Sequence, residues 1–316
     1  MTFTGLLKKM RDEQKINAGQ AGLLLDLHER RIIPVHRELR FFLYFGVLLI
    51  VAGAGLTIKQ YFVHLGDIAI IASLTLCCAA AFVYCFWKGS PFSRREVASP
   101  DMAFDYVLFF GCALFSMDIA YIEMQFHVLG DGWKNYLLIS FALFIFLAYR
   151  FDNRLVLSLA LSTLAAWFGF TLSSRRLFSF AEYYRIYAII YALMVLGMGI
   201  LTNRVAVKKH FFDIYCNFAV HFLCIALIAG VAEYKILSLY FPALLITCVG
   251  LAFYSVRVRK FIYMLYAVIY GYLGVSIVAV DWIHRETFLI FVYFIVTSLF
   301  VIGFIFKMSR QFREEQ

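Results

Sequence analysis

The acidic residues Asp118 and Glu123 lie within one long, mainly apolar stretch, AFDYVLFFGCALFSMDIAYIEMQF. Asp118 is well inside this stretch, and Glu123 lies nearer its end. A charged side chain inside a bilayer is costly unless it has a partner or faces water. Asp118 is therefore a candidate carboxylate for proton coupling or cation binding. The alternative is a buried acid that hydrogen-bonds to a neighbouring helix.

A second group of polar residues follows at the end of this stretch, in the segment IEMQFHVLGDGW. Gln125, His127 and Asp131 join Glu123 there as candidates for a substrate or ion pathway. Histidine and carboxylates together can bind a divalent metal, but no HExxH or comparably short spacing occurs. The sequence therefore predicts neither a metal site nor a cofactor. No nucleotide loop, nucleophile elbow or kinase signature occurs either, so an enzyme is the less favoured interpretation.

Small residues in the first apolar block mark a face that another helix can approach closely. Gly46, Gly53 and Gly55 lie in this block, and the first two share one helical face because they are seven residues apart. These glycines predict helix packing, with a hinge as the alternative.

Aromatic and thiol side chains inside the apolar blocks predict packing rather than chemistry. The pattern Tyr-x2-Tyr-x3-Tyr occurs at 184–191 and again at 263–270. Each copy places three phenols on one helical face, which is typical of a packed or interfacial face. The seven cysteines all fall inside apolar blocks without a CxxC pair, and we expect them to be reduced packing residues.

The elements that position these residues follow from composition. Of the 316 residues 63% are hydrophobic and 16% are charged, whereas a soluble domain carries roughly 25% charged residues. A helix needs about 20 apolar residues to cross a bilayer. The sequence predicts an all-α, polytopic transmembrane helix bundle with about ten spans in a lipid bilayer. The spans are expected near 41–58, 66–87, 103–124, 133–149, 153–172, 184–203, 211–233, 236–256, 261–280 and 286–306. Asp152 and Asn153 suit a tight turn between the fourth and fifth spans.

Basic residues predict the orientation of the bundle. With the N-terminus inside, 22 of the 29 Lys and Arg residues fall in the N-terminal segment, the inner connections and the C-terminal tail. Cytoplasmic connections of membrane proteins carry an excess of Lys and Arg. We therefore expect a multi-pass protein of the cell membrane with both termini in the cytoplasm. The locally basic connection at 173–185 is the exception to this pattern.

Two regions flank the predicted bundle of residues 41–306. Residues 1–40 are expected to form a cytoplasmic segment with a short helix, which starts near Asn17 and rests on the membrane or docks a protein partner. Residues 307–316 are expected to form a cytoplasmic tail. The formal charge of +9 is explained by the inner connections, and because no nucleic-acid-binding motif accompanies it, no nucleic acid is predicted as a partner.

Two stretches resemble a known family. EQKINAGQAGLLLDL leads into the glycine-bearing block FFLYFGVLLIVAGAGLTI, and IEMQFHVLGDGW is followed by RFDNRLVLSLALSTLAAWFG. This order resembles the bacterial membrane proteins of domain of unknown function 2157, over roughly residues 10–170. The resemblance implies a bacterial inner-membrane protein, and it implies that residues 123–131 are site candidates beside Asp118.

Three hypotheses about function remain open at this point. The leading one is a small transporter-like bundle with an intramembrane carboxylate, which requires Asp118 to face a polar cavity. The second is a non-transporting scaffold, sensor or assembly subunit. The third is an intramembrane enzyme, which requires Glu123, His127 and Asp131 to converge.

Overall fold

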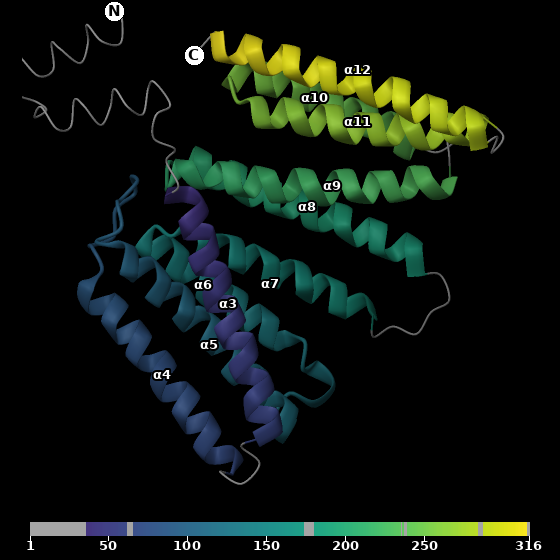
Figure 1. Cartoon of the computed structure of the whole chain (residues 1–316). Coiled ribbons are helices and arrows are strands. Elements are labelled where there is room, and N and C mark those ends of the chain that lie inside the picture. Colours follow the sequence, from purple (N-terminus) through teal and green to yellow (C-terminus); the bar gives the residue numbers. More distant parts are fainter. Residues whose placement is uncertain are drawn as a thin grey trace, which may run out of the picture. The chain divides into compact units, whose positions relative to one another are not determined.

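The computed structural model describes residues 36–61, 66–173, 180–234, 236, 239–283 and 287–314. All ten predicted spans coincide with a long α-helix, and the described residues contain no strand (Figure 1). The helices are α3 (His36–Tyr61), α4 (Asp67–Lys88), α5 (Met102–Phe126), α6 (Asn135–Phe151), α7 (Arg154–Ser173), α8 (Phe180–Arg204), α9 (Phe212–Tyr234), α10 (Tyr240–Val258), α11 (Phe261–Trp282) and α12 (Thr287–Glu314).

Seven of these helices are long and apolar enough to cross a membrane, namely α4, α5 and α8 to α12. Shorter apolar segments occupy α3, α6 and α7, at Phe42–Ala54, Asn135–Phe151 and Arg154–Phe170. The all-helical class and several apolar helices typical of a membrane protein are thus confirmed. A count of ten spans stays a prediction for the three shorter segments.

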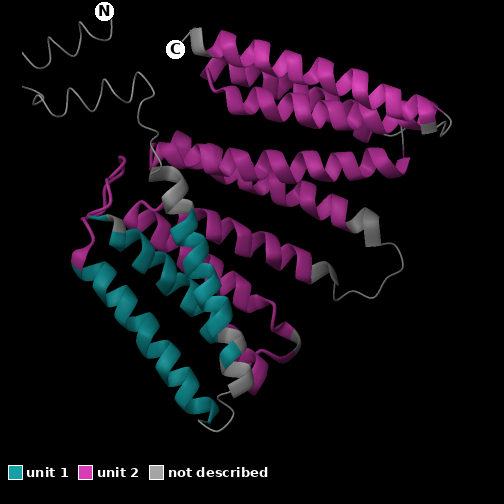
Figure 2. Cartoon of the chain, in the orientation of Figure 1, with its two compact units in different colours: residues 1–87, 101–118 teal, residues 88–100, 119–316 magenta. Residues whose placement is uncertain are grey.

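The chain divides into two compact units, which Figure 2 shows in different colours. The first unit contains residues 1–87 and 101–118, and the second contains residues 88–100 and 119–316. The described part of the first unit is α3, α4 and the first part of α5. Its helices pack through aromatic and small side chains. Tyr44 of α3 lies against Tyr106 and Phe109 of α5, with ring centroids 4.7 and 5.3 Å apart.

The second unit is built from successive helix pairs. In the pairs α6–α7, α8–α9 and α10–α11 each helix packs against the next one in the chain, and α12 lies along α11. Small residues permit close approach in two of these pairs. A Cβ on Gly199 of α8 would lie 2.7 Å from Cβ of Tyr215, and a Cβ on Gly274 of α11 would collide with Leu244 of α10. The bulky partners therefore sit where the glycines leave space.

The predicted tight turn between the fourth and fifth spans is confirmed. Asp152 caps α6 in the left-handed conformation, with φ 58°. Asn153 then caps the start of α7, because its Oδ1 accepts hydrogen bonds from the backbone N–H groups of Leu155 (2.9 Å) and Val156 (3.0 Å). Asp and Asn tolerate this backbone conformation better than most residues, and Asn is a preferred N-cap.

One predicted boundary differs from the structure, and two other predictions are not tested by it. Helix α12 continues to Glu314, beyond the predicted end of the last span, because residues 307–314 include no helix breaker and place Lys and Arg near the helix C-terminus. Within the described part of the chain, a Cβ built on Gly46 or Gly53 meets no atom within 4 Å. Helix packing at these glycines and at Gly55 stays a prediction. Most of the expected segment 1–40, residues 1–35, lies outside the described residues.

Candidate functional site

A pocket of about 310 Å³ lies where α5 leads through the short 3₁₀-helix η1 (Gly130–Gly132) into α6. Its lining combines one carboxylate, one imidazole and two large aromatic rings. The residues are Ala120, Glu123, Met124, His127, Gly130, Trp133 and Tyr136. We call this the Glu123 pocket. Its volume is at the lower end of the range for small-molecule sites, roughly 300–1,000 Å³.

Backbone conformation brings these residues together. The N–H of His127 closes the last turn of α5 by donating to the Glu123 carbonyl (2.9 Å), and the N–H of Gly130 donates to the His127 carbonyl (3.0 Å). His127 and Gly130 both have positive φ, 49° and 50°, which a glycine adopts readily and a histidine rarely. The chain therefore reverses within a few residues, and Trp133 and Tyr136 join residues of α5 in one lining.

The carboxylate of Glu123 is buried and only half satisfied. Glu123 is 8% exposed. Oε2 accepts a hydrogen bond from the backbone N–H of Leu129 at 2.9 Å. Oε1 is buried and has no hydrogen-bond partner among the described residues. A buried carboxylate oxygen without a donor is costly, so it marks a position where a bound group would be stabilised.

Aromatic rings hold the opposite part of the lining in place. Trp133 and Tyr136 stack with centroids 6.1 Å apart and an interplanar angle of 27°. Trp133 also meets Phe170 of α7 edge-on at 5.4 Å, and the neighbouring Trp167 donates from Nε1 to Oδ1 of Asn135 at 3.4 Å. The rings are therefore fixed by contacts from α7.

The structure brings two of the predicted site residues, Glu123 and His127, into one pocket. Gln125 is exposed and is not part of its lining, and the side chain of Asp131 lies outside the described residues. The convergence of three residues that an enzyme would need thus stays a prediction. Within the described part of the chain, no group of three metal-ligating side chains occurs.

Asp118 belongs to the first unit and is buried there. Its Oδ2 accepts a hydrogen bond from Oγ1 of Thr75 in α4 at 2.7 Å, and its Oδ1 is buried without a hydrogen-bond partner among the described residues. Asp118 does not line the Glu123 pocket. A contact with one hydroxyl resembles the packed acid of the alternative interpretation, and a role in proton coupling or cation binding stays a prediction.

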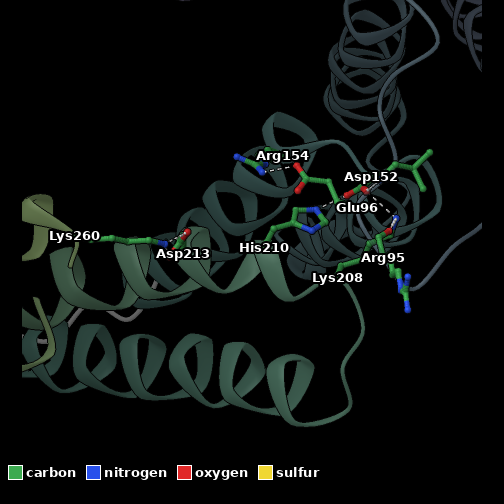
Figure 3. Close-up of polar contacts among 9 residues, drawn as sticks. Arg95, Glu96, Asp152, Arg154, Lys208, His210, Asp213 and Lys260 are labelled. Atoms are coloured by element: carbon green, nitrogen blue, oxygen red, sulfur yellow. Dashed lines mark hydrogen bonds and ion pairs between the residues drawn. The ribbon is translucent and has the colours of Figure 1, made fainter. Parts of the chain in front are cut away.

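A second carboxylate cluster, centred on Asp152, was not foreseen from the sequence (Figure 3). Oδ2 of Asp152 accepts from Nζ of Lys208 (2.9 Å) and from the backbone N–H of Val97 (2.6 Å), and Oδ1 lies 2.5 Å from Nε2 of His210. Lys208 is 1% exposed. We call these four residues the Asp152 cluster. No local pattern could have revealed it, because Val97, Asp152 and His210 are separated by 55 and 58 residues in the chain.

The Asp152 cluster forms hydrogen bonds between residues 88–100 and the rest of the second unit. The backbone N–H of Lys208 donates to the Arg94 carbonyl (2.8 Å), and its Nζ donates to the Arg95 carbonyl (3.0 Å). Beside it, Arg150 donates to the Ser90 carbonyl at 2.6 Å. Three connections that were predicted to share one side of the membrane, 88–102, 150–154 and 204–210, are therefore in mutual contact.

Two further polar contacts involve residues for which the sequence predicted no role. Arg185, a basic residue on the predicted outer side, is buried and forms an ion pair with Glu233. Its guanidinium carbon lies 5.0 Å from the Tyr234 ring centroid and 5.7 Å from that of Tyr240. His221 in α9 contacts the hydroxyl of Tyr270 in α11 at 2.6 Å. The signal for His221 was a lone histidine within an apolar block.

Comparison with known proteins finds a similarity to one protein family. One family model, described as predicted membrane protein (DUF2157), matches residues 8–157. Neither the curated proteins nor the solved structures include a match. The matched part contains the Glu123 pocket residues and Asp152, but neither Lys208 nor His210. The resemblance stated from the sequence is therefore confirmed: residues 8–157 are similar to the DUF2157 predicted membrane proteins.

Proposed function

We propose that this membrane protein binds a small organic cation in the Glu123 pocket and carries it across the membrane. The observation on which this rests is the buried Oε1 of Glu123, which has no hydrogen-bond partner among the described residues although it belongs to a pocket lining. An ammonium group placed there would supply both the missing donor and the opposite charge. The other carboxylate oxygen keeps its bond to Leu129 and fixes the side chain.

The rings of Trp133 and Tyr136 favour the same class of ligand. The negative face of an aromatic ring attracts a cation within about 6 Å of its centroid, and Trp is the strongest such partner. A carboxylate beside two aromatic rings is therefore suited to a substituted ammonium ion, with methyl groups against the rings. His127 adds a polar group to the lining of the pocket.

Transport is favoured over a scaffold role by the pocket's place in the chain. The pocket lies at the junction of two apolar helices, at the end that the pattern of basic residues assigns to the outer side. We propose that the ten helices all span the bilayer, with both termini in the cytoplasm. A solute reaching this pocket would then come from outside. The alternative, a sensor, would bind the same cation without moving it.

Binding is tested with the full-length protein in lipid nanodiscs. The probe is choline, whose quaternary nitrogen carries the positive charge and whose hydroxyl is its hydrogen-bond donor, and 3,3-dimethylbutan-1-ol serves as the uncharged isostere with the same hydroxyl. We expect choline to quench or shift tryptophan fluorescence through Trp133 and the isostere to bind at least tenfold more weakly. Glu123→Gln preserves size but removes the charge, and it should weaken choline binding about 10- to 100-fold, because the quaternary ammonium loses its counter-charge. Glu96→Gln alters an exposed carboxylate outside the pocket and should leave binding unchanged.

Movement is tested with radiolabelled choline and proteoliposomes preloaded with unlabelled choline. Wild-type protein should accumulate label by exchange, and Glu123→Gln should reduce the initial rate at least tenfold relative to Glu96→Gln. Binding without exchange would contradict transport and support the sensor alternative. Equal binding of choline and its isostere, or full binding by Glu123→Gln, would contradict the cation site itself.

A further inference from the structure

Polar residues recur along one stripe of α9 and one stripe of α11. On α9 they are Asp213, Asn217 and His221, spaced four residues apart, and on α11 they are Tyr263, Tyr266 and Tyr270. Residues three or four apart share a helical face. The two helices pack against each other, and contacts between the stripes occur at both ends. We call these six residues the α9–α11 seam.

His221 occupies the deep end of the α9–α11 seam. It is the tenth of the 23 residues of α9, a helix long and apolar enough to cross a membrane. Its Nδ1 lies 2.6 Å from the hydroxyl of Tyr270, and its ring meets Tyr266 edge-on with centroids 4.6 Å apart. An ionisable side chain at such a depth is rare and is usually functional.

The other end of the α9–α11 seam reaches the end of the helices. Lys260, just before α11, donates to both carboxylate oxygens of Asp213, at 2.6 and 2.5 Å. The side chains of Asp213 and Lys260 are 41% and 42% exposed. The hydroxyl of the buried Tyr263 donates to Oδ1 of Asp213 at 3.3 Å. From Asp213 to His221 the helix rises about 12 Å, and polar side chains lie along this distance.

Asn217 lies midway along this row, one turn from each end. Its Oδ1 is buried and has no hydrogen-bond partner within the described part of the chain. Tyr263 and Tyr266 continue the row on α11, with ring centroids 6.2 Å apart. The seam thus holds more hydrogen-bonding capacity than its own contacts use, which pure packing would not require.

We infer that the α9–α11 seam is a proton-binding site, in which His221 takes up a proton that enters from the Asp213 end. The proton comes from water and forms a new N–H bond on the imidazole, and release reverses this step. In neutral His221 the hydroxyl of Tyr270 can donate to Nδ1, and in the imidazolium Nδ1–H donates to the same hydroxyl. One contact therefore serves both protonation states.

The groups around the seam are compatible with a positive imidazolium. The titratable side chains in the core formed by α9, α10 and α11 are neutral when protonated, namely the phenols on α11, Tyr240 and Tyr254 of α10, and the buried thiols of Cys216, Cys224 and Cys248. At the end of the seam near the helix termini, the charges of Asp213 and Lys260 compensate each other. Lys260 lies in the connection between α10 and α11, which is predicted to face the cytoplasm. The proton would therefore enter from the cytoplasm, by a route that does not involve the Glu123 pocket.

Nitrogen-15 NMR of labelled imidazoles tests the inference with full-length protein in nanodiscs. His221→Gln identifies the signal of His221, and His127→Gln controls for the loss of one histidine. We expect the His221 nitrogens to titrate within the pH range over which the protein stays folded. Tyr270→Phe removes the hydroxyl partner and should move the midpoint, whereas Tyr187→Phe, in the tyrosine triplet of α8, should not.

The outcomes separate clearly. A titrating His221 whose midpoint responds to Tyr270→Phe but not to Tyr187→Phe supports the proton site. Signals that stay constant over the whole range, or an equal response to both tyrosine substitutions, would overturn it. Choline binding by His221→Gln reports separately on the cation pocket, so failure of one proposal is distinguishable from failure of the other.

Discussion

Asp152 and Glu123 are both buried carboxylates of the second unit, one after and one before α6 in the chain, yet their surroundings differ. Asp152 meets three donors: a buried ammonium, an imidazole and a backbone N–H. Glu123 meets one backbone N–H, and its second oxygen has no hydrogen-bond partner among the described residues. Burial alone therefore does not separate a structural acid from a binding one.

The difference lies in how completely each charge is compensated. A buried ion pair with all its hydrogen bonds fixes the chain, and removing one partner leaves an isolated charge at high cost. A half-satisfied carboxylate adds little to stability and leaves capacity for a ligand. We therefore read the Asp152 cluster as the fastening of three connections and the Glu123 pocket as a binding site.

The largest effect should follow from Asp152→Asn. This change preserves shape but leaves Lys208 buried without its counter-charge, so we expect the unfolding free energy to fall by about 3–5 kcal/mol. Denaturant unfolding in detergent micelles measures it. Glu96→Gln breaks an exposed ion pair with Arg154 and should cost at most about 1 kcal/mol. Adding Lys208→Met to Asp152→Asn should recover part of the loss, and a double variant as unstable as additivity predicts would contradict the pairing.

A much smaller effect is expected for Glu123→Gln. The amide has no charge to compensate, so the unfolding free energy should stay within about 0.5 kcal/mol of wild type or rise. The same unfolding experiment applies, now without any added cation. A loss comparable to that of Asp152→Asn would show that Glu123 is structural and would remove the contrast between the two acids.

Reporter fusions test the sides of the membrane predicted for the two connections. Green fluorescent protein and alkaline phosphatase are each fused after residue 98, in the connection fastened by Asp152, and after residue 133, in the connection that lines the Glu123 pocket. The predicted topology requires fluorescence at the first position and phosphatase activity at the second. The same reporter active at both positions would contradict the placement of the two acids on opposite sides.

Local signals in the sequence predicted much of this architecture. Long apolar blocks located the ten α-helices of the described residues, because helix length and hydrophobicity are properties of contiguous residues. The turn at Asp152 and Asn153 was predictable because both residues favour such a backbone. Glu123 and His127 line one pocket, since they are four residues apart at the end of one helix, and their role as site residues stays a prediction.

The contacts across the fold could not be predicted in the same way. Asp152 looked like a turn residue, and nothing near it indicated Lys208 or His210, which reach it only through tertiary structure. The second tyrosine triplet was assigned to packing, whereas Tyr263 and Tyr270 also donate or accept hydrogen bonds across to α9. A single sequence shows which side chains are polar but not which distant side chain each one meets.

The Asp152 cluster also bears on where this protein can be divided. The family match ends at residue 157, whereas the Lys208 ammonium and the His210 imidazole that contact Asp152 lie farther along the chain. A fragment trimmed to the matched region would keep the Asp152 carboxylate and lose both of these partners, so we expect it to be less stable than the same residues in the full chain. Within this chain, the matched region therefore ends between an acid and the side chains that compensate it.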